Sequence, residues 1–167
     1  RREQGQIFLE VHDNGRGVVR NDSGEPNFEH IATHVCDSMK RKLLDRRGVH
    51  GEYGIGLLSF WSIGDSLEMT SQGGDGQPYR MSLRRGAPDY RIGSVRDRLQ
   101  FGMGGTSLLV GPLLETTKNT LTGEKIQRYL SAELRDRIRD TGVRIRILDK
   151  VSRKDFDVTP REFEGRR

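Results

Sequence analysis

The sequence QIFLEVHDNGRG, residues 6–17, decides the fold. Apolar and polar side chains alternate along its first half, which places Ile7, Leu9 and Val11 on one face of the chain. A period of two residues is typical of a strand that buries one face in a sheet. We therefore expect a strand over residues 6–12 that runs directly into a glycine-rich turn at 13–17.

Apolar spacing predicts the remaining elements. Positions 28, 31, 35, 39 and 43 are apolar, which predicts an amphipathic helix over 28–43 that begins near Asn27. The same periodicity predicts a helix over 122–140, ended by Gly142. The other expected elements are a short buried helix over 56–63 and strands over 67–71, 79–83, 90–95, 106–110 and 143–148. This order predicts an α+β fold with helices on one face of a mixed sheet.

Composition bounds the class of protein. A chain of 167 residues fits one ordinary domain, and its longest apolar run, 57–63, is far shorter than the roughly 20 residues that cross a membrane. Cys36 is the only cysteine, so no intrachain disulfide can form, and we expect a cytoplasmic protein. The net charge is +5, and residues 40–47 hold five bases and one acid. Elsewhere in the chain, acidic and basic residues are interspersed. A nucleic-acid partner is therefore compatible with the net charge but is not indicated by it.

The first motif with chemical content is Asp13-Asn14-Gly15-Arg16-Gly17, directly after the expected strand. Ligands often bind beyond strand ends, where a carboxylate can accept a hydrogen bond from an exocyclic amine. Glycines beside it let a flat ring approach the backbone. The alternative is an Asx turn, which Asp-Asn-Gly also forms.

The second motif, GVHGEYGIGLLS at residues 48–59, places three glycines with GxxGxG spacing, Gly51, Gly54 and Gly56, before a short apolar helix. Such a loop can present several backbone N–H groups to phosphates at the helix N-terminus. A Walker P-loop is excluded because Leu57 and Leu58 follow Gly56, and the dinucleotide-binding fingerprint also fails. A structural glycine turn is the alternative.

The third motif, Gly104-Gly105-Thr106, opens the expected strand 106–110. The order and spacing of the three motifs, with the basic loop between the first two, resemble the GHKL ATPases. This superfamily comprises gyrase-type topoisomerases, heat-shock chaperone ATPases, histidine kinases and MutL mismatch-repair proteins. The resemblance covers about residues 7–111 and looks closer to the chaperone and MutL-like branches. It implies a Bergerat-type two-layer sandwich, with helices on one face of a mixed, mainly antiparallel sheet.

The resemblance also implies a nucleotide site for ATP or ADP. Asp13 would hold the adenine amino group, Gly15 and Gly17 would line the base, and Thr106 would support the Asp13 end of the pocket. The glycines of the second motif would wrap the phosphates, with residues 40–50 as a mobile basic lid. The implied nucleotide-binding residues are Asp13, Asn14, Gly15, Gly17, Val18, Gly51, Tyr53, Gly54, Ile55, Gly56 and Thr106.

The chain departs from the family pattern before the first motif. GHKL enzymes carry there a helix with a Glu that activates water and an Asn that binds Mg²⁺, and residues 1–12 contain no such pair. We therefore expect the first helix to be missing, the general-base Glu to lie upstream of Arg1, and Mg²⁺ to bind only in the complete protein. This chain alone is expected not to hydrolyse ATP.

The expected organisation is an N-terminally incomplete GHKL-type domain over 1–150, followed by a polar C-terminal extension over 151–167. The expected function is ATP binding that switches the conformation of a complete ATPase. The expected partners are an adenine nucleotide, an unidentified protein and a second copy of the chain, with no membrane. The alternative is a non-catalytic interaction or nucleic-acid-binding module on the same fold, which ATP or ADP binding would distinguish.

Overall fold

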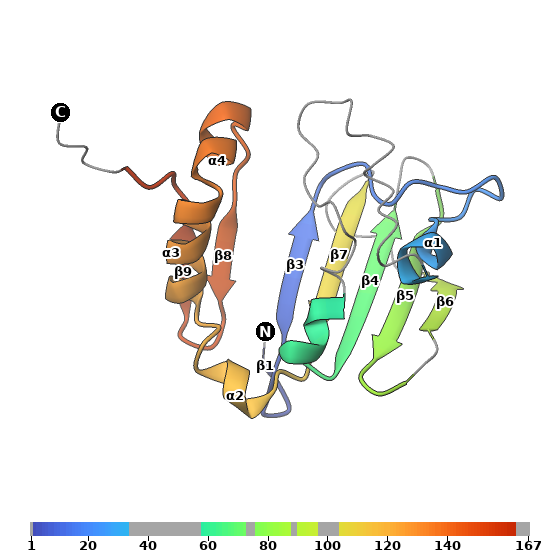
Figure 1. The fold of residues 1–167 in the computed structure, drawn as a ribbon, viewed down its shortest axis with the longest axis horizontal. Coiled ribbons are helices and arrows are strands. Elements are labelled where there is room, and N and C mark those ends of the chain that lie inside the picture. Colours follow the sequence, from blue (N-terminus) through green and yellow to red (C-terminus); the bar gives the residue numbers. More distant parts are fainter. Residues whose placement is uncertain (1, 34–57, 73–75, 88–89, 97–103, 163–167) are drawn as a thin grey trace. The chain divides into compact units, whose positions relative to one another are not determined.

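The computed structural model describes residues 2–33, 58–72, 76–87, 90–96 and 104–162 (Figure 1). The chain forms two compact units. We call Phe8–Leu114 the sheet unit, and Arg1–Ile7 together with Glu115–Arg167 the terminal unit. The predicted functional boundary at residue 150 stays a prediction.

The sheet unit carries one five-stranded sheet and short helices. Its elements are β3 (Leu9–Asp13), α1 (Phe28–Thr33), the 3-10 helix η2 (Leu58–Ser62), β4 (Ser66–Gln72), β5 (Tyr79–Arg84), β6 (Tyr90–Ser94) and β7 (Gly105–Val110). The strands lie in the order β3-β7-β4-β5-β6 (Figure 1). The expected α+β class is confirmed.

Every pairing between these described strands is antiparallel, whereas the sequence predicted a mixed sheet. β7 causes the difference, because it inserts between β3 and β4 and runs opposite to both. β4, β5 and β6 follow one another as neighbouring antiparallel strands. β3 and β4 therefore run in the same direction on either side of β7, and the connection between them, which contains α1 and η2, crosses over that strand.

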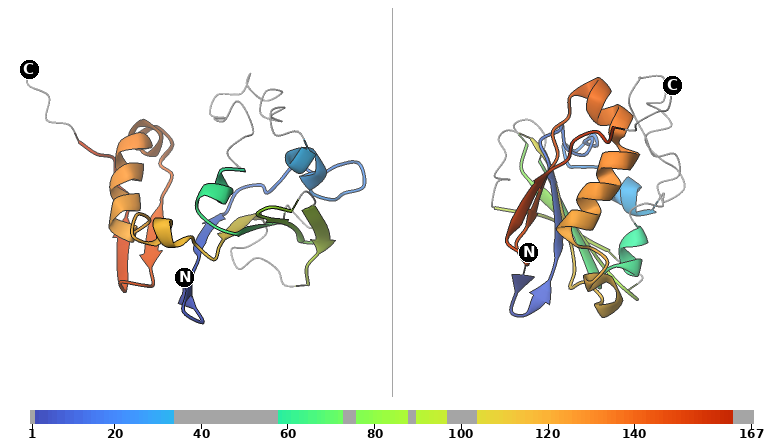
Figure 2. Two further views of the ribbon diagram at one scale, coloured as in Figure 1. Left: turned by 60° about the horizontal axis from the view of Figure 1, so that its bottom comes forward. Right: turned by 90° about the vertical axis from the view of Figure 1, so that its left-hand side faces the viewer.

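One face of the sheet is apolar and carries the helices. The register places Leu67 opposite Val110, and Met69 opposite Met81, so these side chains share a face. Figure 2 shows α1 and η2 on the same side of the sheet. Phe28 of α1 is fully buried, as is nearly all of Phe60 of η2. Each such ring contributes about 1.5 to 3 kcal/mol through burial, which fixes these helices on the apolar face.

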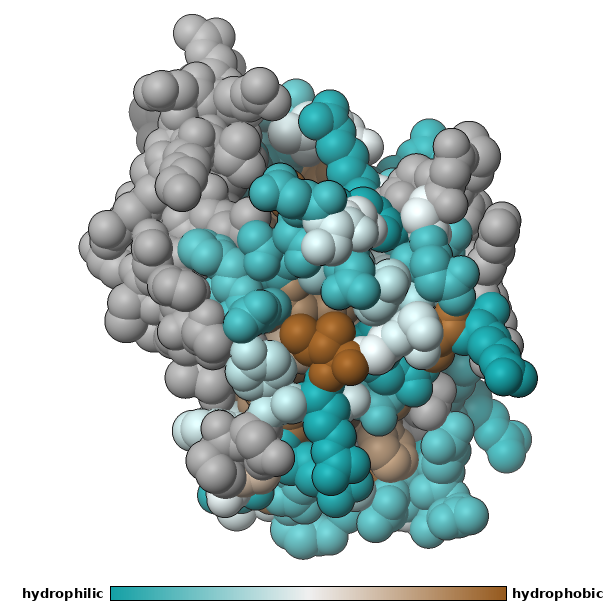
Figure 3. Space-filling model, turned by 90° about the vertical axis from the view of Figure 1, so that its right-hand side faces the viewer, coloured by the Kyte–Doolittle hydropathy of each residue, from teal (hydrophilic) through white to brown (hydrophobic). Residues whose placement is uncertain are grey.

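The opposite face of the sheet is polar. Arg80 of β5 lies 3.3 Å from the Glu68 carboxylate of β4, and its Nε donates to the Thr70 hydroxyl at 3.1 Å. These polar side chains alternate with the apolar ones along each strand, because successive residues of a strand point to opposite faces of the sheet. Seen from the β6 side, the visible apolar surface forms small areas among hydrophilic atoms (Figure 3).

The first predicted strand, 6–12, is divided in the structure. β1 (Arg2–Glu3) and β2 (Gln6–Ile7) form a small antiparallel hairpin, and β3 begins only at Leu9. Between them, the Phe8 ring lies against Gly111, where an added Cβ would come within 2.4 Å of the ring. Phe8 therefore packs against the end of β7 instead of continuing the hairpin.

The predicted helix 28–43 begins where expected. The Asn27 side chain accepts a hydrogen bond from the His30 N–H at 3.3 Å, as an N-cap does. The part of this helix beyond Thr33 lies outside the described residues. Of the predicted helix 56–63, the structure describes the part from residue 58 onward, where the chain forms the 3-10 helix η2.

The loop between the first motif and α1 is fastened to the sheet. The Tyr79 hydroxyl of β5 donates to the Glu25 carboxylate at 3.1 Å, and this bond raises the pKa of Tyr79. Arg20 donates to the carbonyl oxygens of Gly24 and of Gln77, the latter at 3.2 Å. The loop therefore returns the chain from the end of β3 to the helix-covered face.

The terminal unit is built from helices and a second hairpin. Besides β1 and β2 it contains α2 (Glu115–Lys118), α3 (Gly123–Glu133), α4 (Arg135–Thr141), β8 (Arg146–Asp149) and β9 (Lys154–Asp157). β8 and β9 pair in antiparallel register. α3, at 11 residues, is the longest described helix, and no described helix is long and apolar enough to cross a membrane.

The predicted helix 122–140 is wrong in one respect, since the chain forms two helices that meet at Leu134. This residue has φ −99° and ψ 12°, outside helical geometry. Its N–H still donates to the Leu130 carbonyl at 2.9 Å, and its carbonyl accepts from the Ile138 N–H at 2.8 Å. The break is therefore a local distortion without a side-chain cap. The predicted end at Gly142 is confirmed by its left-handed φ of 66°.

Asp149 joins the start of α3 to the β8–β9 turn. One carboxylate oxygen accepts from the Gly123 N–H at 3.1 Å, and the other accepts from the N–H groups of Val151 and Ser152 at 3.0 Å. Partial burial by itself raises the pKa of Asp149, but the hydrogen bonds from Ser152, Gly123 and Val151 together outweigh it. The net effect is a lowered pKa.

Acid is expected to remove the contribution of Asp149 to stability. Because the folded state lowers this pKa, the contribution is complete above about pH 4, the ordinary range of Asp, and is lost as the pH falls through the lower folded value. Asp149→Asn should therefore cost about 1 kcal/mol at pH 7 and much less near pH 2.5. Urea unfolding followed by far-ultraviolet circular dichroism at both pH values measures this. An equal difference at the two pH values would contradict the lowered pKa.

Candidate functional site

The sheet register brings the first and third motifs together at one end of the apolar face. Thr106 of β7 is paired directly with Asp13 of β3 on one side and with Ser71 of β4 on the other. Residues paired in this way project from the same face, with Cβ atoms about 5 Å apart. Three polar side chains from three neighbouring strands therefore lie in a row where the apolar face ends.

Asp13, the first predicted site residue, is exposed and forms the Asx turn that the sequence left open as an alternative. Its Oδ1 accepts from the Gly15 N–H at 2.7 Å. The second carboxylate oxygen, Oδ2, accepts no hydrogen bond from the described residues, and an ionised carboxylate has capacity for several. The turn and a ligand-binding role are therefore compatible at this residue.

Gly15 and Gly17 each occupy a position where a side chain does not fit. An added Cβ at Gly15 would lie 2.8 Å from Asp13 Oδ1. Gly17 has a left-handed φ of 73°, and its Cβ would lie 2.7 Å from the Gln72 carbonyl oxygen and 2.8 Å from Ser71 Oγ. The glycines of the motif are therefore required by the turn and by its close approach to β4.

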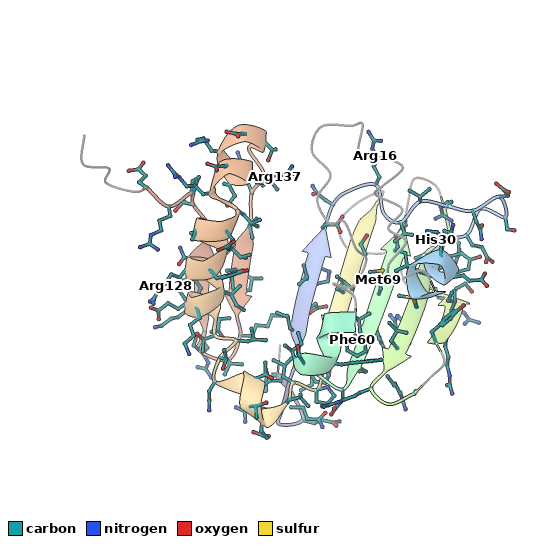
Figure 4. All side chains as sticks on the ribbon, in the orientation of Figure 1. Arg16, His30, Phe60, Met69, Arg128 and Arg137 are labelled. Carbon is teal, nitrogen blue, oxygen red and sulfur yellow. The ribbon has the colours of Figure 1, made fainter. Side chains whose placement is uncertain are left out.

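The remaining residues of the turn differ in environment. Asn14 and Arg16 are exposed, and Arg16 points outward beyond the strand ends (Figure 4). The backbone N–H of Val18, a predicted site residue, donates to Ser71 Oγ at 2.7 Å. Arg16 therefore offers a cation at the edge of the site that the sequence reasoning did not assign.

Gly105 explains why the third motif contains glycine. Its φ is 132°, and an added Cβ would lie 2.1 Å from the Asp13 carbonyl oxygen and 3.3 Å from Asn14 Cα. This close approach aligns the first motif with Thr106. The Thr106 hydroxyl is half-buried and has no hydrogen-bond partner among the described residues.

The second motif cannot be placed from the structure. Its predicted site residues lie outside the described residues, as do the basic stretch 40–50 and its expected role as a lid. These residues are Gly51, Tyr53, Gly54, Ile55 and Gly56. Among the predicted site residues, the structure therefore describes only those that the resemblance assigns to the base.

Ser71 is the residue that the sequence reasoning missed. It is fully buried, at the end of the apolar row of β4 that contains Leu67 and Met69. A polar side chain at a position where the alternation expects an apolar one is the signal that could have found it.

Two shallow hollows lie elsewhere on the described surface. One, of about 590 Å³, belongs to the terminal unit and is lined by Arg135, Arg139, Thr159, Pro160, Arg161 and Glu162. The other, of about 390 Å³, is lined by Asp65, Ser66, Arg84, Arg85 and Pro112. Arg139 is already paired with Asp136 and Asp140, both at 3.0 Å. Neither hollow contains a predicted site residue, so the strand-end row remains the candidate site.

Comparison with models of known protein families found no match, and comparison with curated proteins found none either. The resemblance to GHKL ATPases therefore rests on the three motifs, their order and their spacing.

Proposed function

We propose that the sheet unit binds an adenine nucleotide, ATP or ADP, in the manner of a GHKL-type Bergerat domain. The observation that carries the proposal is the direct pairing of Asp13 with Thr106, because it joins two motifs more than 90 residues apart at one strand end. The resemblance implies this juxtaposition, and an unrelated pair of glycine turns has no need of it.

The chemistry of the strand-end row supports recognition of an amine. Asp13 Oδ2 is open to a donor, and the 6-amino group of adenine is a donor that hypoxanthine lacks. The Thr106 hydroxyl beside it can donate to a ring nitrogen or accept from a bound water. The resemblance would place the base against the backbone of Gly15, which is exposed, and of Gly17, whose Cβ side is already occupied by β4.

The phosphate-binding half of the proposal rests on the sequence alone. It assigns the phosphates to the glycines of residues 51–56 and the lid to the basic stretch 40–50. Nucleotide binding would then switch the conformation of that segment and its contacts with a partner protein or a second copy. A cytoplasmic location belongs to the same proposal, supported by the single cysteine.

ATP hydrolysis by the complete protein is a further part of the proposal, supported by the resemblance. We assign neither the metal ligand nor the general base to the described residues, because the resemblance places both on a helix before the first motif.

Calorimetric titration with ATP and with inosine triphosphate (ITP) tests the proposal. ATP should bind with a measurable heat, and ITP should bind at least about tenfold more weakly, because it presents a carbonyl oxygen where ATP presents an amine. Absence of ATP binding at millimolar concentration would overturn the proposal and favour the interaction-module alternative. Equal affinities would remove Asp13 from base recognition.

A further inference from the structure

Ser71 makes two bonds that connect three segments of the sheet unit. Its Oγ accepts from the Val18 N–H at 2.7 Å and donates to the Gly105 carbonyl oxygen at 3.5 Å. The side chain is fully buried. One hydroxyl therefore joins the end of the first motif, the start of the third motif and strand β4.

The first motif depends on this hydroxyl for its position. Gly17 approaches β4 so closely that no Cβ fits between it and Ser71 Oγ, and the next residue, Val18, donates to that same oxygen. At the other end of the motif, Asp13 is held by its pairing with Thr106. The Asp13–Val18 turn is therefore fixed at both ends, once by the strand ladder and once by Ser71.

We infer that Ser71 is a positioning residue for base recognition, fastening the Asp13–Val18 turn so that the free carboxylate oxygen of Asp13 faces the adenine amine. This inference rests on the proposed function. β7, with Thr106, separates the strand of Ser71 from that of Asp13, so Ser71 acts on the ligand only through the turn. Its loss should affect a ligand that uses Asp13 and spare one that does not.

Ser66 provides a matched control within the same strand. Its hydroxyl also donates to a backbone carbonyl, that of Gly111, at the opposite end of β4. Five residues separate Ser66 from Ser71, or about 16 Å along a strand. Ser66→Ala therefore removes a comparable bond between β4 and the end of β7 without touching the turn.

The experiment compares Ser71→Ala, Ser71→Cys and Ser66→Ala with the unaltered protein, using calorimetric titration with ATP and with ITP. Cysteine keeps the volume of the buried side chain while replacing a strong acceptor with a weak one, so it remains informative where alanine impairs folding. We expect both Ser71 variants to reduce the preference for ATP over ITP at least about fivefold. Ser66→Ala should leave that preference unchanged.

The outcomes separate this inference from the proposed function. A Ser71 variant that weakens ATP and ITP equally, or that keeps the full preference, would overturn the positioning role. ATP binding absent from the unaltered protein would overturn the proposed function instead. Amide hydrogen exchange of Val18 tests the fastening without nucleotide, because it should accelerate at least tenfold in Ser71→Cys and not in Ser66→Ala. Unchanged exchange would refute the fastening itself.

Discussion

Replacement of Asp13 with Asn is expected to weaken ATP binding by about 5- to 150-fold while leaving the fold intact. The amide oxygen of Asn can still accept from the Gly15 N–H, so the Asx turn survives. Its NH₂ group would take the place of Oδ2 and present a donor to the donor of the adenine amine. A donor left unsatisfied once the bound base covers it costs about 1 to 3 kcal/mol, which corresponds to that change in Kd.

Asp22→Asn is the control for the loss of charge. Asp22 is an exposed acid in the loop after the motif, so this variant changes the net charge by the same amount without altering the strand-end row. Calorimetric titration with ATP should show unchanged affinity for Asp22→Asn. An Asp13→Asn protein that binds ATP as tightly as the control would remove Asp13 from the site.

The fold was predictable where the local periodicity is long and regular. The stretches around Leu67 and Met81 alternate between apolar and polar residues, and each forms the expected strand, as does the short apolar run at 108–110. The capping side chain at Asn27 and the left-handed Gly142 mark the helix ends that they predict. These signals are local, so a single sequence contains them in full.

Other features depend on contacts that the local sequence does not encode. No proline or glycine near Leu134 marks the helix break in the sequence. The backbone hydrogen bonds also continue through the break, so it is a change of local geometry alone. β9 contains one inward apolar residue, Phe156, paired with Ile147, which is too short a pattern to predict. The position of β7 between β3 and β4 is a property of the whole sheet.

The same distinction between local signals and long-range contacts applies to the candidate site. The glycine motifs point to close backbone approaches, which the structure describes at Gly17 and Gly105. Ser71 was not predictable as part of the site, since its partner Val18 lies 53 residues away and only the folded sheet brings them together. Recognition of the nucleotide itself stays a prediction.

Gly105→Ala is expected to cause the largest loss of stability in the sheet unit, about 2 to 6 kcal/mol. A φ of 132° is a region that alanine adopts only with strain of about 1 to 3 kcal/mol. The new methyl group would also lie 2.1 Å from the Asp13 carbonyl oxygen, so β3 and β7 would have to separate at this end. Overpacking of this kind costs about 1 to 3 kcal/mol more.

Two glycine variants at sites where an added Cβ meets no other atom serve as controls for the loss of stability in Gly105→Ala. Gly24 also has a positive φ, but at 76° it lies close to the left-handed helical region, and nothing lies within 4 Å of an added Cβ, so Gly24→Ala should cost only about 1 kcal/mol of conformational strain. Gly93 in β6 has equally open surroundings and no positive φ, so Gly93→Ala should be neutral or slightly stabilising.

Trp61 reports on these variants, because it is the only tryptophan and its ring packs edge-on against buried Phe60 at 5.8 Å in the sheet unit. Urea unfolding followed by its fluorescence should rank Gly105→Ala far below Gly24→Ala. Since the clash acts on the backbone of Asp13, Gly105→Ala should also weaken ATP binding under conditions where it remains folded. Equal stability of the two variants would show that the first and third motifs do not meet at this strand end.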